Sequence, residues 1–434
     1  MVEKTSFDRS NQLRDEVLNI IPLGAQTFTR SYTQFPYNYS PLFVTRGEGS
    51  HIWDVDNNEY IDLLSGLLSV ILGYCDPDVN KAISDQLQKG ITFSLSSELE
   101  AELANLLIKH IPSAEMVRFG KNGSDCTSAS IRLARYVTKR DHVGMCGYHG
   151  WHDWYAGITT LHHGVPDVVS QLAHTFAYND IDSLQKIFDG FPEQVAAIIM
   201  EPINIEEPKD GFLEKVRELA DKNGTLLIFD EVITGFRYDI GGAQTYFSVT
   251  PDLSVFGKAM GNGMPISALV GKKIYMQNMT KIFFSSTFAP ETLSLAASIE
   301  TIKKISRENV IDKIWEKGNY LKKHVNKFIQ KHQLENFIKL KGLAPWVIVT
   351  FHDYPHVSAA VLRTLFQKEM IQNGILILTS HNINYALSEE DMNKILEVYD
   401  KTLCKISELI RTSKLDESLD TKLLEPVFTV RRYK

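Results

Sequence analysis

Two adjacent acids and a lysine form the most distinctive chemical pattern in this 434-residue sequence. Asp230 and Glu231 directly follow the apolar run 226–229, which is too short for a typical helix and is predicted to be a buried parallel strand. Lys258 lies 28 positions beyond Asp230 (258 − 230), between small residues. Because ligands of open α/β sheets bind at the carboxyl ends of the strands, the acid and the lysine are expected to meet there. A lysine that forms a Schiff base and an acid that keeps a pyridine nitrogen protonated suit pyridoxal phosphate (PLP).

A glycine-containing turn before a helix is the second candidate binding feature. The strand predicted at 117–119 leads into Gly-Lys-Asn-Gly-Ser-Asp-Cys-Thr, and a helix follows. Free backbone N–H groups and the positive end of the helix dipole make Gly123, Ser124 and Asp125 a seat for a dianionic phosphate. The lysine of a P-loop and the triple glycine of a dinucleotide fold are absent, which disfavours ATP and NAD. Serine and aspartate are also ordinary helix caps, and that role is the alternative.

An aromatic and histidine-rich segment follows the strand predicted at 143–147. Tyr148 comes directly after this strand, where its ring could stack on a planar heterocycle next to the phosphate seat. His149 and His152 could instead bind a metal, but the sequence offers no clear third ligand. We therefore favour a packing or supporting role for His149 and predict no metal site.

The alternation of strands and helices predicts the fold class. The apolar run 195–200 is a second buried strand that ends at Glu201, and a helix over 213–223 leads to the strand before Asp230. This order predicts an α/β fold with a mainly parallel sheet. The expected organisation is an N-terminal segment with a small antiparallel sheet (1–60), a large cofactor-binding domain (61–310) and a smaller C-terminal α/β domain (311–434).

The two ends of the chain carry further predicted elements. A helix is expected up to about residue 20, and the aromatic-rich segment 24–40 is expected to be a loop of the long kind that is often functional. Arg30 is the main cation of this loop, and it could clamp an anionic substrate group or be a solvated surface residue. Long Lys- and Glu-rich helices are predicted over 302–332 and 388–413.

Composition and charge restrict the partners. With 44% hydrophobic and 23% charged residues, a net charge of −7 and a pI near 6.0, the chain has no basic field for nucleic acid or an anionic membrane. Four widely spaced cysteines without a C-x-x-C pair indicate reduced thiols. The N-terminus lacks the apolar core of a signal peptide, and no apolar stretch is long enough to span a bilayer. We expect a cytoplasmic protein whose partners are small molecules or copies of itself.

The motifs together resemble the class III aminotransferases of fold type I, especially the branch around glutamate-1-semialdehyde aminomutase. The resemblance covers almost the whole chain, and its most specific parts are the segment 229–237, Phe-Asp-Glu-Val-Ile-Thr-Gly-Phe-Arg, and the later Gly257-Lys258. It implies a homodimer whose active sites lie at the subunit interface.

The resemblance also implies roles for individual residues. Lys258 would be the lysine bound to PLP, and Asp230 the partner of the pyridine nitrogen. A close carboxylate in a low-dielectric site raises the pKa of that nitrogen, which agrees with this role. Val232 would pack on one face of the ring and Tyr148 on the other. Glu201 would lie on the side of the ring oxygen and orient its neighbours.

The phosphate site is where the sequence departs from the family pattern. Gly123, Ser124 and Asp125 would bind the phosphate, within Asn-Gly-Ser-Asp instead of the family's Ser-Gly-Thr-Glu. The change is conservative because backbone amides supply much of the grip. Thr287 would reach the phosphate that is bound in the neighbouring subunit.

Two reactions fit this machinery. Transfer of an amino group from a donor to a keto or aldehyde acceptor is one, and transfer within one molecule, as in the aminomutase, is the other. Arg30 favours the aminomutase, because its position resembles an arginine that grips the substrate carboxylate. Against it, the segment 152–166 looks shorter than the gating loop of aminomutases, and residues 65–67, Ser-Gly-Leu, lack an expected tryptophan. Since exchange of donor and product needs an open site, we favour the intermolecular transaminase.

The substrate is less clearly indicated than the reaction. The hydroxyl-rich loop 27–39 and the pair Trp151 and Trp154 suit a sugar or a small phosphorylated or carboxylated ketone, as in amino-sugar or surface-polysaccharide synthesis. A non-catalytic binding protein of the same fold is the alternative from another class. The intact Lys258 and Asp230 argue against it.

Overall fold

A computed structural model of the protein describes residues 6–424. The described chain forms two compact units. The large unit contains residues 68–70 and 77–311, and the small unit contains residues 6–67, 71–76 and 312–424. The first and last described residues thus belong to the same unit.

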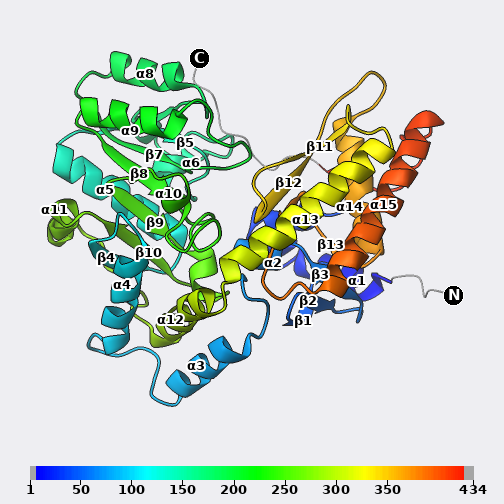
Figure 1. Ribbon diagram of the computed structural model, residues 1–434, viewed down its shortest axis with the longest axis horizontal. Coiled ribbons are helices and arrows are strands. Elements are labelled where there is room, and N and C mark those ends of the chain that lie inside the picture. The colour runs from blue at the N-terminus through cyan, green and yellow to red at the C-terminus, as the bar shows by residue number, and fades with distance from the viewer. Residues whose placement is uncertain (1–5, 425–434) are drawn as a thin grey trace. The chain divides into compact units, whose positions relative to one another are not determined.

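A seven-stranded sheet forms the centre of the large unit, in the order β4-β10-β9-β8-β7-β5-β6 (Figure 1). Strands β9, β8, β7, β5 and β6 are parallel, whereas β10 is antiparallel to both β9 and β4. The predicted α/β fold with a mainly parallel sheet is therefore confirmed. The strands are β4 (Met116–Gly120), β5 (His142–Cys146), β6 (Ala173–Thr175), β7 (Val195–Met200), β8 (Leu226–Asp230), β9 (Leu253–Phe256) and β10 (Ser267–Gly271).

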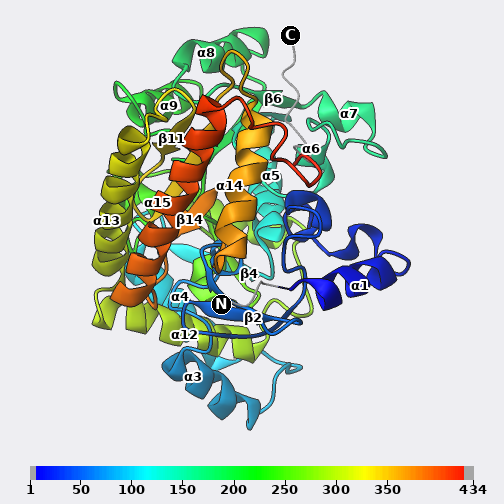
Figure 2. The same ribbon diagram turned by 90° about the vertical axis from the view of Figure 1, so that its right-hand side faces the viewer.

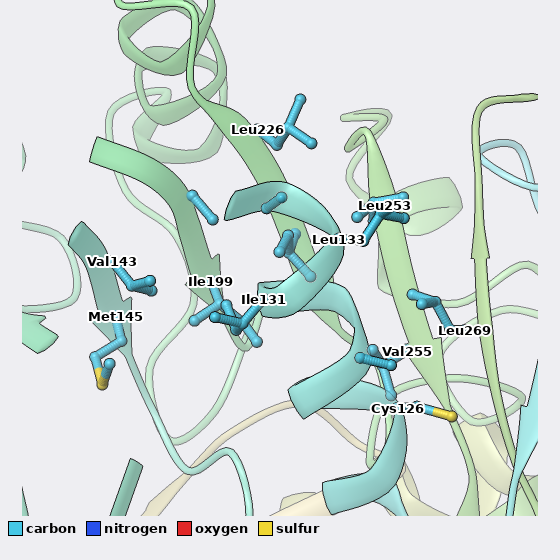
Figure 3. Packing of buried hydrophobic residues seen from close by; sticks show 14 of the residues in the cluster. Cys126, Ile131, Leu133, Val143, Met145, Ile199, Leu226, Leu253, Val255 and Leu269 are labelled. Carbon is cyan, nitrogen blue, oxygen red and sulfur yellow. The ribbon is translucent and has the colours of Figure 1, made fainter. Parts of the chain in front are cut away.

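Successive side chains of a strand point to opposite sides of the sheet. Both sets of side chains are apolar here, and helices cover both faces of the sheet. Ile199 of β7 and Ile228 of β8 pack with the helix α5 (Gly123–Thr138). Ile198 and Leu227 pack instead with α8 (Ile181–Gly190) and α9 (Phe212–Lys222). Figure 3 shows the first of these cores, with α5 lying across the strands. The continuous apolar runs of β7 and β8 are thus explained by burial on both faces.

The other elements of the large unit include the three longer helices α3, α4 and α12. Helix α4 (Glu98–His110) begins as predicted, since the Glu100 carboxylate accepts the Ser97 N–H at 2.9 Å. The remaining elements are α3 (Pro77–Leu87), α6 (Asp153–Ala156), α7 (Asp167–Ser170), α10 (Ala243–Tyr246), η4 (Lys258–Gly261), α11 (Lys273–Met276), η5 (Gln277–Lys281) and α12 (Thr292–Arg307).

The single helix predicted over 302–332 is wrong. Helix α12 ends at Arg307, and α13 (Val310–Lys331) begins after a break. Asn309 lies in this break with φ of 51°, a left-handed conformation that a continuing helix cannot contain and that asparagine tolerates well.

The small unit contains two sheets and long helices (Figure 2). Antiparallel strands β1 (Val44–Glu48), β2 (His51–Asp54) and β3 (Glu59–Asp62) form the expected N-terminal sheet, and β13 (Ile375–Leu376) joins it parallel to β3. The second sheet has the order β11 (Ile338–Lys341), β12 (Trp346–Phe351) and β14 (Ser380–Asn382). The helices are α1 (Asp8–Val17), α13, α14 (Ala359–Gln372), α15 (Glu389–Arg411), the short α2 (Ser65–Leu68) and the 3-10 turns η1 (Pro22–Gly24), η2 (Phe28–Arg30) and η3 (Tyr32–Gln34).

Candidate active site

Neighbouring strands bring the predicted catalytic and cofactor-binding residues to one edge of the large sheet. The strands β9, β8, β7 and β5 are adjacent and parallel, so their carboxyl ends share an edge. Lys258 follows β9, Asp230 ends β8, Glu201 follows β7 and Tyr148 follows β5. Residues separated by as many as 110 positions in the sequence (258 − 148) therefore lie along the same edge of the sheet.

Asp230 is buried, with 5% of its surface exposed. It lies on the same side of β8 as Leu226 and Ile228, the side that faces α5. One carboxylate oxygen accepts the Val232 N–H at 3.2 Å, and the other lies 2.8 Å from Nδ1 of His149. The aspartate is thus fixed by two contacts.

His149 is the site residue whose role the sequence left open. The ring is buried, and within residues 6–424 its Nε2 has no hydrogen-bond partner. Nδ1 is the ring nitrogen that faces the Asp230 carboxylate, so it is the one that donates to Asp230. The Trp154 ring lies parallel to it, with the ring centroids 6.3 Å apart. His149 therefore positions the Asp230 carboxylate.

Glu231 has a different role from its neighbour. It is fully buried, and its carboxylate accepts the backbone N–H groups of Ala243 at 2.7 Å and Gln244 at 2.8 Å, at the start of α10. The hydroxyl of Thr234 donates to it at 2.5 Å. Glu231 thus anchors the segment after β8, and Asp230 is the acid of the site.

Lys258 begins the 3-10 turn η4 with φ of 43°. Burial lowers the pKa of its amine to about 8, although the charges of Glu201 and Asp230 act in the opposite direction. These two carboxylates therefore lie close enough to act on the lysine, as the shared sheet edge predicts. An amine with this pKa has an appreciable neutral fraction near pH 7.

Glu201 fixes the beginning of the loop after β5. Its Oε2 accepts the Tyr148 N–H at 3.0 Å and the Asn204 side-chain amide at 2.6 Å. Burial raises the pKa of this carboxyl, and the nearby Asp230 adds to the increase. A Cβ atom on Gly147 would lie 2.4 Å from the same oxygen, so the tight contact requires glycine there. Glu201 thus orients its neighbours, as the resemblance implies.

The phosphate seat predicted at Gly123, Ser124 and Asp125 lies at the start of α5 and stays a prediction. The Asn122 side chain caps the helix by accepting the Asp125 N–H at 3.2 Å, and the Asp125 carboxylate accepts the N–H groups of Lys121 and Asn122 at 2.9 and 3.0 Å. The carboxylate of Asp125 is therefore committed to capping. The first-turn N–H groups of Gly123 and Ser124 have no intrahelical acceptors and remain for an anion.

Two close approaches shape this phosphate seat. A Cβ atom on Gly123 would lie 3.0 Å from Cγ2 of Val232, so the Val232 side chain lies directly beside the seat. A Cβ atom on Gly150 would lie 2.2 Å from Oγ of Ser124, and Gly150 has φ of 102°. Glycine is required at Gly150 for both reasons.

The other predicted residues are exposed. The ring of Tyr148 is about half exposed and makes an edge contact with Tyr155. Trp151 is 69% exposed, and Thr287 lies on an exposed segment between Phe283 and Phe288. The stacking, substrate and phosphate roles of these residues stay predictions.

Arg30 belongs to the small unit, where it is exposed at the end of η2. Burial raises the pKa of Tyr74 in the same unit, and the charge of Arg30 acts against that increase, so the two are near each other. The Tyr74 hydroxyl donates to Asp62 at 2.6 Å. Ser65 and Leu67 nearby in sequence have φ of 44° and 60°, a strained conformation that often occurs at functional sites. The role of Arg30 in substrate binding stays a prediction.

Two further properties concern metals and membranes. Within residues 6–424, no group of three or more His, Cys, Asp or Glu side chains could hold a metal ion. No helix of the described chain has the length and apolar character needed to cross a bilayer.

The fold and the site define a PLP-dependent enzyme of fold type I. The chain belongs to the class-III aminotransferase family, because the model of that family matches residues 33–402. A 3-aminobutyryl-CoA aminotransferase of Cloacimonas acidaminovorans is 37% identical over 94% of this chain and 100% of its own length. A glutamate-1-semialdehyde 2,1-aminomutase of Natranaerobius thermophilus is 32% identical over 90% and 97%. The FumI protein of Sphingopyxis sp. MTA144, solved in its PLP internal aldimine form, is 27% identical, with a TM-score of 0.85 over 93% of this chain and 98% of that chain.

The residues present fit PLP. The phosphate seat has open backbone N–H groups and no Cβ on Gly123, where Val232 would collide with a larger residue. A buried aspartate that is positioned by a histidine suits a protonated pyridine nitrogen. Lys258, which follows the neighbouring strand β9, would supply the amine. The predicted family, cofactor and enzyme class are thus confirmed.

Proposed function

We propose that the protein is an intermolecular transaminase, which takes an amino group from a donor and gives it to a keto or aldehyde acceptor. The observation that carries this proposal is the order of Lys258, Asp230 and Glu201 after three adjacent parallel strands. The names of relatives include both an aminotransferase and an aminomutase, and the aminotransferase covers more of this chain.

The residues of this chain divide the chemical work. PLP, when bound, supplies an electron sink for negative charge that develops at the substrate carbon. Asp230 keeps a proton on the ring nitrogen, and His149 orients Asp230 by donating from Nδ1. Lys258 moves a proton at the substrate carbon, and the lowered pKa of about 8 lets its amine accept and release that proton near neutral pH. Glu201 fixes Tyr148, which we propose packs on the cofactor ring opposite Val232.

We propose that the enzyme is a homodimer. Large apolar side chains near the start of α12 are exposed, including Leu95 at 84% and Phe288 at 60%. The Thr292 N–H donates to the Ile91 carbonyl at 2.9 Å, which places the segment containing Leu95 beside this helix start. Such exposed apolar patches mark interaction surfaces. Thr287 lies at the same place, in agreement with a role at the partner's phosphate.

A subunit-mixing experiment tests the dimer and the role of Thr287 together. Inactive Lys258→Ala chains and impaired Thr287→Val chains are co-expressed with different tags, and the mixed dimer is purified. It should regain close to half of the wild-type activity, because its one intact lysine meets an intact partner threonine. A mixed dimer of wild type with the double variant should stay impaired. Equal activity of both mixed dimers would refute the transfer of Thr287 across the interface.

The substrate is proposed from the site and from the relatives. The sequence favours a sugar or a small phosphorylated or carboxylated ketone as the acceptor. The relative named for 3-aminobutyryl-CoA leads us to add a 3-oxoacyl thioester as the acceptor to be tested first. The four cysteines are free thiols, which supports a cytoplasmic location.

A donor and acceptor panel tests the reaction. The PLP-loaded enzyme is mixed with single amino donors, and the keto product is quantified per active site. A transaminase gives one equivalent of keto product and returns to its original spectrum when an acceptor is added. Rapid turnover of glutamate-1-semialdehyde without a donor, and no keto product from any donor, would instead support the aminomutase.

A further inference from the structure

A pocket lies between α5 and the segment 151–154 in the large unit. Its volume is about 400 Å³, which is within the range of small-molecule sites. Arg132 and Arg135 line the pocket from α5. Trp151 and Trp154 line it from the segment that follows β5. None of the roles proposed above uses the two arginines.

Two positive charges face this pocket. Arg132 is exposed, and one of its terminal nitrogens donates to the Phe283 carbonyl. Arg135 is partly buried, and its Nε donates to the Asp141 carbonyl at 2.8 Å. These backbone contacts hold both side chains in place, and a guanidinium fork matches phosphate oxygens. Asp153 is the single carboxylate in the lining, so the balance favours an anion.

Aromatic rings complete the pocket. The Ser128 hydroxyl is 2.6 Å from Nδ1 of His152 and accepts the indole N–H of Trp154 at 2.8 Å. These contacts fix both rings. Trp151 packs edge-on against His152, with 4.6 Å between the ring centroids, and leaves most of its own surface exposed. An exposed indole beside fixed cations suits a planar base that carries phosphate groups.

The pocket is connected to the phosphate seat by α5 and Trp151. The Trp151 N–H donates to Oγ of Ser124 at 3.4 Å. Arg132 and Arg135 lie 8 and 11 residues beyond Ser124 in the same helix (132 − 124 and 135 − 124). At 1.5 Å per residue they are about 12 and 16 Å farther along the helix axis. This spacing is too large for the reacting end of a substrate and fits the remote end of a long one.

We propose that this pocket binds the adenosine-phosphate end of an acyl-coenzyme A substrate whose acyl end reaches the cofactor. The inference rests on the proposed transaminase function and defines its substrate class. The two arginines bind the phosphates, and Trp151 stacks on the base. A free nucleotide that acts as an effector has the same chemistry, and the experiment separates the two.

Kinetics of the PLP-loaded enzyme test the proposal. The double variant Arg132→Gln/Arg135→Gln is compared with Arg118→Gln, which removes an arginine that donates to the neighbouring Phe284 carbonyl at 3.1 Å but lies outside the pocket. With 3-oxobutyryl-CoA as acceptor, the double variant should lose at least tenfold in kcat/KM through KM. With free 3-oxobutyrate it should equal wild type, and Arg118→Gln should equal wild type with both.

Adenosine 3′,5′-bisphosphate serves as the binding probe. It should inhibit competitively against 3-oxobutyryl-CoA, and calorimetry should show at least tenfold weaker binding to the double variant. Equal kcat/KM of wild type and double variant for the thioester would overturn the proposal, as would non-competitive inhibition, which indicates an effector site. If amino donors give no keto product while the probe still binds through the arginines, the proposed function fails and the nucleotide pocket remains.

Discussion

Removal of the His149 side chain tests the contact that positions the Asp230 carboxylate. His149→Phe keeps a flat buried ring but removes the donor to Asp230, which is then left with only the Val232 N–H at 3.2 Å. His149→Asn keeps a short donor near the position of Nδ1. The first variant should impair the enzyme, and the second should recover part of the loss.

The magnitude follows from the buried, charge-assisted hydrogen bond of 2.8 Å between His149 and Asp230. Such a bond contributes about 1.5–3 kcal/mol. If it acts on the transition state, kcat should fall about 10- to 150-fold, at 1.36 kcal/mol per tenfold. In a double-mutant cycle with Asp230→Asn, the two losses should be strongly non-additive, with a coupling of at least about 1 kcal/mol.

The assay is the single-turnover rate with a fixed amino donor, measured over a range of pH. His332→Asn is the matched control, because that histidine is partly buried and lies 2.7 Å from an aspartate, Asp400, but belongs to the small unit and does not touch Asp230. The control should keep at least half of the wild-type rate. Additive effects of His149→Phe and Asp230→Asn, or an equal loss in His332→Asn, would refute the positioning role of His149.

Three other perturbations address the cofactor site. Gly150 has φ of 102°, and a Cβ atom there would lie only 2.2 Å from Oγ of Ser124 in the predicted phosphate seat. Gly150→Ala should therefore weaken PLP binding at least tenfold in a fluorescence titration. Gly190→Ala, whose Cβ would have no atom within 4 Å, should leave PLP binding unchanged. Glu201→Ala should lower kcat/KM about 10- to 150-fold, because the Tyr148 N–H loses its buried acceptor, at about 1.5–3 kcal/mol for a charged partner; an unchanged rate would contradict this. Burial lowers the pKa of Lys258 to about 8, so the neutral amine at pH 7 is about 300-fold more abundant than in free lysine. The rate of PLP uptake by the apoenzyme should therefore rise with pH and level off above about pH 8. A rate that still rises tenfold per pH unit above pH 9 would contradict the lowered pKa.

The parts of the site that depend on local sequence were predictable. The run before Asp230 is apolar and short, so its burial and its strand conformation follow from composition alone. Its register then places Asp230 on the α5 side of the sheet. The start of α5 was predictable for the same reason, because the cap at Asn122 and Asp125 is encoded within four residues.

The parts that depend on strand order were not predictable in the same way. His149 reaches Asp230 because β5 and β8 are separated only by β7, and that order is set by packing of the whole sheet. The different roles of Asp230 and Glu231 required knowledge of α10, which lies beyond the strand. The break at Asn309 was missed because the flanking segments share the same Lys- and Glu-rich composition.

The central claim is that Lys258, supported by Asp230, catalyses transfer of an amino group between two molecules. The most direct measurement is a single-turnover experiment in which the PLP-loaded enzyme meets one amino donor and the keto product is counted per active site. Wild type should give close to one equivalent, and Lys258→Ala, loaded with the same cofactor, should slow the reaction by several orders of magnitude. Keto product at the wild-type rate from Lys258→Ala, or none from wild type with any donor, would contradict the account.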